Sequence, residues 1–341
     1  MRYTKPFYLL ALVISGISST YAGEVNPSTQ LYWGDTHLHT SYSPDASLNG
    51  NTKIGPEEAF RFARGEAIEG HSGQIAKLHR PLDFLVVADH AEYLGLLPRI
   101  RAKDPLLMKN KITRRWGDLI ASGKEENTWK AMFEVLHDIE VNKPSFKDNS
   151  IMRSAWARII EAADKYNQAN KFTAFIGYEW TSMPKGNNLH RVVIYKDDGS
   201  RASQMLPFSS FDSEDPEKLW GFLADYEKRT GGEILAIAHN GNMSNGLMFQ
   251  TTDFDGNPIG QQYAQTRNRW EPLYEVSQIK GDGETHPLLS PEDPFAEFEN
   301  WDKGNLTASA AKEDWMLQYE YARSALRIGL SIENKVGTNP Y

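Results

Sequence analysis

Short apolar runs recur along the chain and predict a set of buried strands. The runs do not alternate between apolar and polar residues, which is typical of strands covered on both faces. We expect six such strands, at 31–36, 83–88, 172–177, 191–195, 234–238 and 273–277.

Helical periodicity separates these runs. Amphipathic stretches with helix-start signals predict helices at 56–69, 216–229 and 313–328. Residues 96–170 read as helical throughout, and we interpret them as an insertion or lid on one domain that spans 23–341. Buried strands separated by helices predict an α/β fold with a parallel sheet or barrel, whose active site forms at the carboxyl ends of the strands.

The first 22 residues have the pattern of a signal peptide. Arg2 and Lys5 precede a mostly apolar run at 7–17, and small residues at Thr20 and Ala22 predict cleavage after Ala22. An uncleaved membrane anchor is the alternative, but the run is shorter than the roughly 20 residues that span a bilayer. We therefore expect a periplasmic or secreted protein with no stable membrane span.

The amino-acid composition limits the partners, nucleophiles and metal ligands that the chain can use. The net charge of −8 argues against a general nucleic-acid binder and is compatible with a small-molecule substrate. The chain has no cysteine, so a thiol nucleophile, a disulfide framework and an iron–sulfur cluster are excluded. Any metal must be held by His, Asp, Glu and water, ligands that suit Mn, Zn or Fe.

The first candidate ligands follow the first predicted strand. His37 and His39 stand two residues apart, and in an extended chain such side chains point the same way. The pair could bind one ion, but one buried and one exposed structural histidine is an equally good interpretation of these two residues alone.

Four more positions combine a ligand side chain with a strand end. They are the pair Asp89 and His90 after 83–88, Glu179 after 172–177, His190 before 191–195, and His239 after 234–238. Each has a structural alternative, such as a helix cap for Asp89 or an ion pair with an arginine for Glu179. Because they share one kind of position, we predict a polynuclear metal site. His71, His79 and His137 lie elsewhere and are interpreted as ordinary surface or packing residues.

These motifs resemble the PHP superfamily, named for polymerase and histidinol phosphatase. The resemblance rests on GDTHLHT at 34–40, ADH at 88–90, Glu179, His190 and His239. The chain is more closely similar to a secreted branch described only as a domain of unknown function, through LYWGDTHLHTS at 31–41, QIKGDGETH at 278–286 and GTNPY at 337–341.

The resemblance implies a distorted (β/α)7-type barrel that holds two or three divalent metal ions. His37 and His39 would bind one ion, Glu179 would bridge two ions, and His190 would bind the second. The same resemblance implies that His90 and His239 complete the cluster and that Asp89 is a ligand or orients an imidazole. The usual reaction of the superfamily is hydrolysis of a phosphoester.

One element of the superfamily pattern is missing. No Asp-x-His motif follows His239, which leads us to expect a chain that is incomplete at its C-terminus. The nearest substitute contains Glu284 and His286, but it already matches another phrase of the branch, so we do not assign it that role.

The expected mechanism is attack of a metal-activated hydroxide on a phosphate ester. His90 or His239 would assist the leaving group. Arg191 would contact the phosphate, with an ion-pairing role as an equally good alternative. Tyr42 and Asn240 are weaker pocket candidates.

Two other functions remain open at this point. An amidohydrolase also begins with His-x-His after a strand, although it commonly uses a lysine where this chain has Glu179. A non-catalytic exported metal-binding or scaffold protein is the second alternative. A partner-binding role for the tryptophans is weaker, because Trp116, Trp129 and Trp156 lie in helical contexts where core packing is common.

Overall fold

The computed structural model describes residues 30–341, and Trp33–Tyr341 forms one compact unit. The predicted signal peptide lies outside the described residues. Within the described part of the chain, no helix combines the length and the apolar character needed to cross a membrane.

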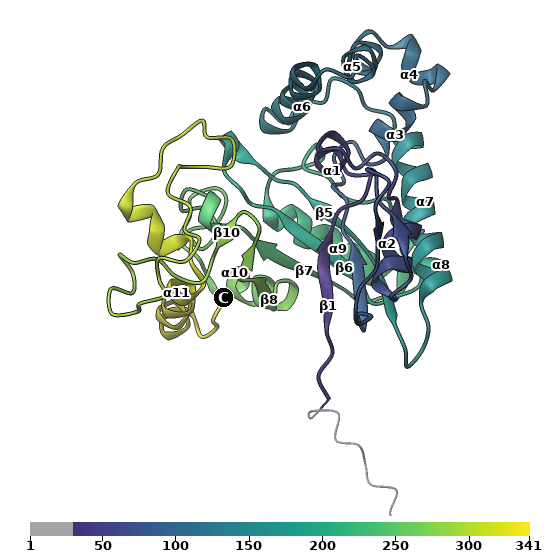
Figure 1. Cartoon of the computed structure of the whole chain (residues 1–341). Helices are drawn as coiled ribbons and strands as arrows, with labels where there is room; N and C mark the ends of the chain where they lie inside the picture. The colour runs from purple at the N-terminus through teal and green to yellow at the C-terminus, as the bar shows by residue number, and fades with distance from the viewer. Residues whose placement is uncertain (1–29) are drawn as a thin grey trace, which may run out of the picture. The chain divides into compact units, whose positions relative to one another are not determined.

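The unit is a mixed α/β structure (Figure 1). Its strands are β1 (Gly34–Leu38), β2 (Ile68–Glu69), β3 (Ile75–Ala76), β4 (Phe84–Val87), β5 (Thr173–Trp180), β6 (Arg191–Tyr195), β7 (Ile234–His239), β8 (Leu273–Glu275), β9 (Ser277–Gln278) and β10 (Gly281–Asp282).

Helices surround these strands. They are α1 (Pro44–Leu48), α2 (Pro56–Ala63), α3 (Leu96–Arg101), α4 (Pro105–Lys109), α5 (Lys111–Ala121), α6 (Glu125–Glu140), α7 (Asn149–Tyr166), α8 (Gly199–Ala202), α9 (Pro216–Thr230), α10 (Gln261–Trp270) and α11 (Ala322–Val336), with 3-10 turns η2 (Pro184–Gly186), η3 (Gly241–Met243) and η4 (Asp314–Tyr319).

Six strands form the main sheet, in the order β1-β4-β5-β6-β7-β8. The expectation of a parallel sheet is wrong at one strand, because β6 is antiparallel to both β5 and β7. The other neighbouring pairs are parallel. The short connection from β5 to β6 explains the reversal, since a parallel return needs a crossover of about a dozen residues or more.

The sheet is curled into a half-barrel. Strands β1 and β8 stand at opposite ends of the strand order, yet His37 Nδ1 of β1 lies 2.8 Å from Glu275 Oε2 of β8. Side chains, rather than a backbone ladder, therefore connect the two edge strands across the concave face. The (β/α)7 barrel and the C-terminal incompleteness remain predictions.

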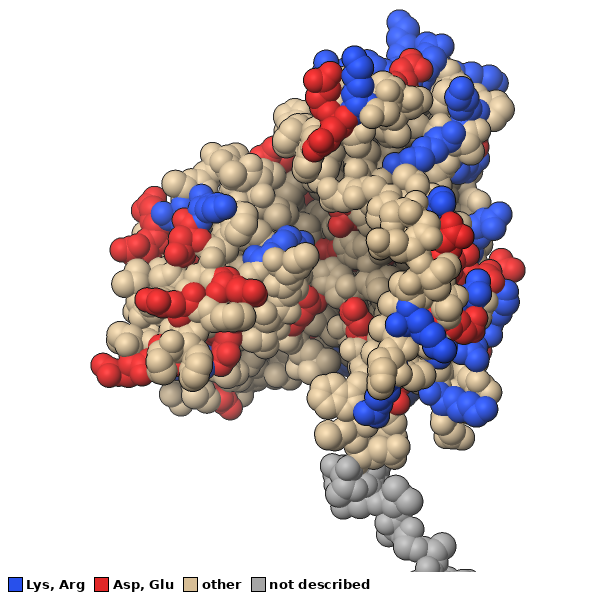
Figure 2. All heavy atoms as spheres, viewed as in Figure 1, with Lys and Arg blue, Asp and Glu red and all other residues tan. Residues whose placement is uncertain are grey.

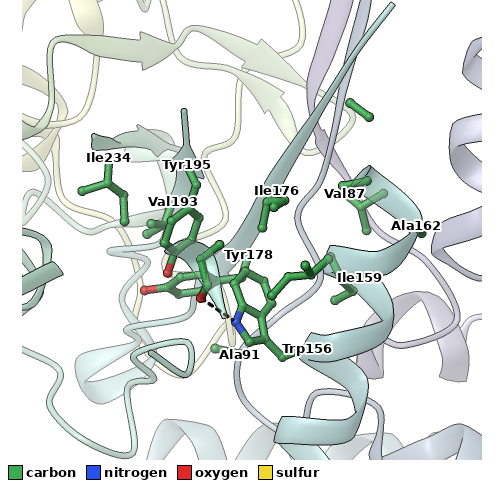
Figure 3. Close-up of a cluster of buried hydrophobic side chains, with 14 of the residues drawn as sticks. Val87, Ala91, Trp156, Ile159, Ala162, Ile176, Tyr178, Val193, Tyr195 and Ile234 are labelled. Atoms are coloured by element: carbon green, nitrogen blue, oxygen red, sulfur yellow. Dashed lines mark hydrogen bonds between the residues drawn. The ribbon is translucent and has the colours of Figure 1, made fainter. Parts of the chain in front are cut away.

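The main core lies between the sheet and the helices that cover its convex face (Figure 3). Along β5 the side chains alternate, so Tyr178 and Trp180 enter this core together with Trp156 of α7. Glu179 falls on the other face, where it pairs in register with Val192 of the small cluster on the concave side.

Two predicted helices differ from the structure. The helix expected at 56–69 ends at Ala63, because Gly65 turns the chain with φ +83° and Ile68–Glu69 then pairs with β3. The helix expected at 313–328 is split into η4 and α11. The split lies beside Glu320, whose buried carboxylate binds Lys312 at 2.6 Å, so tertiary contacts override helical propensity there.

The tryptophans test the packing argument. Trp156 is 1% exposed, meets Tyr178 edge-on with ring centroids 6.0 Å apart and donates to the Ala202 carbonyl, whereas Trp129 is 43% exposed. We expect Trp156→Ala to lower the free energy of unfolding by about 3–5 kcal/mol, because it leaves a large cavity. Trp129→Ala should cost less than about 1 kcal/mol. Urea denaturation followed by circular dichroism measures both; equal losses would contradict this packing account.

Candidate metal centre

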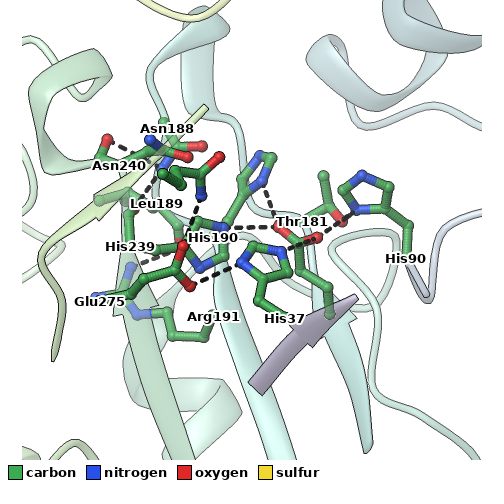
Figure 4. A network of polar contacts seen from close by, with 12 residues as sticks. His37, His90, Thr181, Asn188, Leu189, His190, Arg191, His239, Asn240 and Glu275 are labelled. Atoms are coloured by element: carbon green, nitrogen blue, oxygen red, sulfur yellow. Dashed lines mark hydrogen bonds and ion pairs between the residues drawn. The ribbon is translucent and has the colours of Figure 1, made fainter. Parts of the chain in front are cut away.

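Figure 4 shows His37, His190 and His239 close to one another in the candidate site, whose centre is a carboxylate at the end of β5. Glu179 is fully buried, and its Oε2 atom faces three imidazoles. The distances from Oε2 are 2.8 Å to His39 Nε2, 3.2 Å to His37 Nε2 and 3.2 Å to His90 Nδ1. Three of the predicted ligands thus meet at one carboxylate oxygen.

The second oxygen of Glu179 faces a different pair. Its Oε1 atom lies 2.8 Å from His190 Nδ1 and 2.9 Å from His239 Nε2. The structure therefore brings all five of these histidines to Glu179, three on one oxygen and two on the other.

Sheet topology explains why residues at different strand ends converge. His239 is the last residue of β7, and Glu179 stands one residue before the end of the parallel strand β5. His190 precedes β6, but β6 runs in the opposite direction, so its start lies at the edge where its neighbours end. The reversal that contradicts the parallel prediction is thus what brings His190 into the site.

Two carboxylates that the sequence analysis missed hold the His-x-His pair. His37 Nδ1 lies 2.8 Å from Glu275, and His39 Nδ1 lies 2.9 Å from Asp45 of α1. With Nδ1 engaged in this way, the Nε2 atom of each ring is directed toward Glu179. The two Nε2 atoms are 3.1 Å apart.

Only one of the two missed residues had a usable sequence signal. Glu275 lies inside the predicted strand 273–277 and pairs in register with His239, so a carboxylate at that strand end could have been added to the set. Asp45 lies in a five-residue helix after a proline, and no strand position singles it out.

The electrostatics of Glu179 favour its ionised form. Burial disfavours the charge, but His90, His37 and His239 and the hydrogen bond with His190 outweigh it and hold the pKa of Glu179 well below its usual range.

The histidines divide into two classes. Burial lowers the pKa of His190 to about 3 and the pKa of His239 to about 4, so both are neutral at pH 7. Burial also acts on His37 and His39, but Glu179 and Glu275 raise the pKa of His37, and Asp45 and Glu179 raise the pKa of His39 well above 6.5.

Four groups of three side chains place ligand atoms within 4.8 Å of one another in the described part of the chain. Together they contain His37, His39, Asp45, His90, Glu179, His190, His239 and Glu275. These buried groups could hold metal ions.

The distances around Glu179 Oε2 support the fit of a metal. These distances, 2.8 to 3.2 Å, are close to the roughly 3.3 Å that separates ligand atoms about a tetrahedral ion with 2.0–2.1 Å bonds.

Two predicted site residues, Asp89 and Arg191, have their polar contacts outside the cluster around Glu179. The carboxylate of Asp89 accepts hydrogen bonds from the backbone N–H and hydroxyl of Thr40, at 2.5 and 2.7 Å, and it belongs to none of the four groups found among the described residues. Burial raises the pKa of Asp89 to about 6. Arg191 forms a buried ion pair with Glu271 at 2.9 Å and donates to the Leu189 carbonyl. The structure therefore shows Arg191 in an ion pair, which was the alternative to a phosphate contact.

The weaker candidates also lie outside the four groups of the described chain. Tyr42 packs against the main core, and Asn240 contacts Asn242 at 3.4 Å. Glu284 pairs with Arg323, and His286 contacts Asp302 at 3.1 Å. Both contacts lie within the segment that follows β10.

A cavity of about 540 Å³ reaches the site from the side of α6, and its lining includes Asp45, His90, Thr181 and His190. Figure 2 shows the surface hollowed below the helices α4–α6. His137, interpreted from sequence as an ordinary residue, also lines this cavity. A second cavity, of about 390 Å³ beside Phe146 and Phe208, contains none of the ligand side chains.

Comparison with known proteins gives one family. No curated protein and no solved structure matches the chain. The model of the family described as protein of unknown function (DUF3604) matches residues 26–341. Because this match covers most of the chain, the protein belongs to the DUF3604 family.

Proposed function

We propose that this protein is an exported, metal-dependent hydrolase of the PHP type that cleaves phosphate esters. The observation that carries the proposal is Glu179, whose two oxygens face separate sets of imidazoles. A carboxylate in that arrangement is suited to join two ions, and paired ions are common in enzymes that hydrolyse phosphate esters. Export rests on the N-terminal pattern of the sequence.

In the proposed site His37 and His39 would hold one ion with Glu179. His190 would hold the second ion with the other Glu179 oxygen, and His239, grouped with His37 and Glu275, would complete the cluster. The group of His39, Asp45 and His90 leaves room for a third. Mixed imidazole and carboxylate ligands suit Zn, Mn or Fe. Glu275 keeps His37 oriented through its Nδ1 contact.

Divalent ions held there would lower the pKa of a water molecule and offset charge that develops on the phosphoryl oxygens. The protein's own groups would position the ester and move a proton. His90 lines the cavity whereas His239 is fully buried, so we assign proton donation to the leaving group to His90. We do not assign Arg191 a phosphate contact, because it is paired with Glu271.

Metal content tests the ligand set. Purified protein loaded with Mn²⁺ or Zn²⁺ should retain two or more ions per chain, and Glu179→Gln should weaken binding by more than about tenfold, because it removes the shared charge. Asp89→Asn is the matched control: it also neutralises a buried carboxylate but should keep its metal. Elemental analysis after dialysis gives the stoichiometry, and equal loss in both variants would argue against Glu179 as the shared ligand.

Substrate panels test the reaction class. We expect hydrolysis of phosphate esters that stops on chelation and returns with Mn²⁺ or Zn²⁺, with carboxylic esters and amides turned over at least about a hundredfold more slowly. Faster amide hydrolysis would favour the amidohydrolase alternative. Retention of metal without turnover of any ester or amide would favour the non-catalytic alternative.

Proton release tests the two classes of histidine. The raised pKa of His39 favours its protonated form in the metal-free site, and this proton must leave before Nε2 binds an ion. His190 and His239 are already neutral. Metal affinity should therefore rise with pH above 6.5 until the raised pKa of His39 is passed.

Calorimetry at pH 7 in buffers of different ionisation enthalpy should show a net number of protons released as the site fills. Asp45→Asn, which removes a carboxylate that raises the pKa of His39, should reduce that number. Identical heats in all buffers would contradict the assignment.

A further inference from the structure

Helix α6 contributes apolar side chains to a core cluster and to a cavity. Ala131 and Val135 are buried in the core cluster with the neighbouring helices, and Val135 also lines the cavity. Met132 and Leu136, one turn apart, and Phe133 between them line the cavity that reaches the metal centre. The helix therefore gives that cavity an apolar wall.

Phe133 is 63% exposed although it is large and apolar. Because it lines the cavity, its exposed ring is available to an occupant of the cavity. Burial of such apolar surface against a ligand favours binding.

The two ends of the cavity differ chemically. His90, His190 and Asp45 line the end at the metal centre, and Met132, Phe133 and Leu306 line the wall. An ester with its phosphoryl group at the histidines would thus extend its organic group along α6.

Among the described residues that line the cavity, Lys280 is the only lysine or arginine. Its carbonyl accepts a hydrogen bond from Asn242 at 3.3 Å, and the Asn242 carbonyl accepts one from Lys312 at 2.7 Å. These contacts tie the backbone of Lys280 to the segment that follows β7. A cation placed there suits an anionic substrate.

We propose that the substrate is an anionic phosphate ester of an apolar aryl or alkyl alcohol, with its apolar group against Met132, Phe133 and Leu136 and its anionic oxygens near Lys280. The proposal rests on the proposed function. In the reaction, water supplies the oxygen of the new P–O bond, the ester P–O bond breaks, and the departing alcohol oxygen takes up a proton.

A sugar or nucleoside alcohol fits this wall poorly. Its hydroxyl groups would lie against methyl, thioether and phenyl groups and lose hydrogen bonds with water. Polar groups do occur in the lining, but Glu140 and Thr307 are already hydrogen-bonded to each other at 3.0 Å.

Two phosphonates, which have no ester bond to hydrolyse, test the pocket without turnover. Calorimetry on the metal-loaded protein should show 1-naphthylmethylphosphonate binding at least about tenfold more tightly than methylphosphonate, because the ring covers apolar wall. Phe133→Ser should remove most of this preference and leave methylphosphonate binding within about twofold.

Phe295→Ser is the matched control, because Phe295 is an exposed phenylalanine that is absent from this cavity's lining. It should keep the preference. Lys280→Gln should weaken the binding of both phosphonates about equally, by several-fold, because Lys280 would contact the phosphonate group that the two compounds share.

Equal affinity for the two phosphonates, absence of binding by either, or equal effects of Phe133→Ser and Phe295→Ser would overturn the proposal. Failure of the proposed function gives a different result. A preference for the naphthyl compound with no hydrolysis of any phosphate ester supports the apolar pocket and rejects the phosphoesterase. Hydrolysis of glycerol phosphate without the preference for the naphthyl compound supports the phosphoesterase and rejects the apolar pocket.

Discussion

The burial of one carboxylate is the constraint on which the rest of this site depends. Glu179 is removed from water at the end of a central strand, and an isolated charge in such a place would be strongly destabilising. Five imidazoles contact its two oxygens, so the carboxylate has polar partners on both sides. Because these partners come from both sides of β5 in the sheet, the site requires the whole sheet to be assembled.

The shape of the sheet follows from the same requirement. Strand β6 runs against its neighbours, which places His190 at the edge where β5 and β7 end. The curl brings Glu275 of β8 to His37 of β1 across the open side of the sheet. Helix α1 adds Asp45 behind His39. Each imidazole of the His-x-His pair is thereby held between a carboxylate at Nδ1 and Glu179 at Nε2, an arrangement that orients rings for metal binding.

Most of the ligand residues could be predicted from the sequence, because apolar runs mark where the buried strands end. His37, His39, His90, His190, His239 and Glu179 were found in this way. The direction of β6 could not be read from its apolar run, which is the same in parallel and antiparallel strands. Asp45 could not be found because only the folded chain brings α1 to His39. Asp89 and Arg191 have the right chemistry and position, but their partners Thr40 and Glu271 are set by packing.

The most direct test is a crystal structure of the metal-loaded protein with anomalous diffraction recorded at the edge of the bound metal. The account predicts two anomalous peaks, each about 2.0–2.2 Å from a different oxygen of Glu179. One peak should lie beside His37 and His39, and the other beside His190. A structure of fully loaded protein with no peak at Glu179, or with a single ion bound through only one of its oxygens, would contradict the central claim.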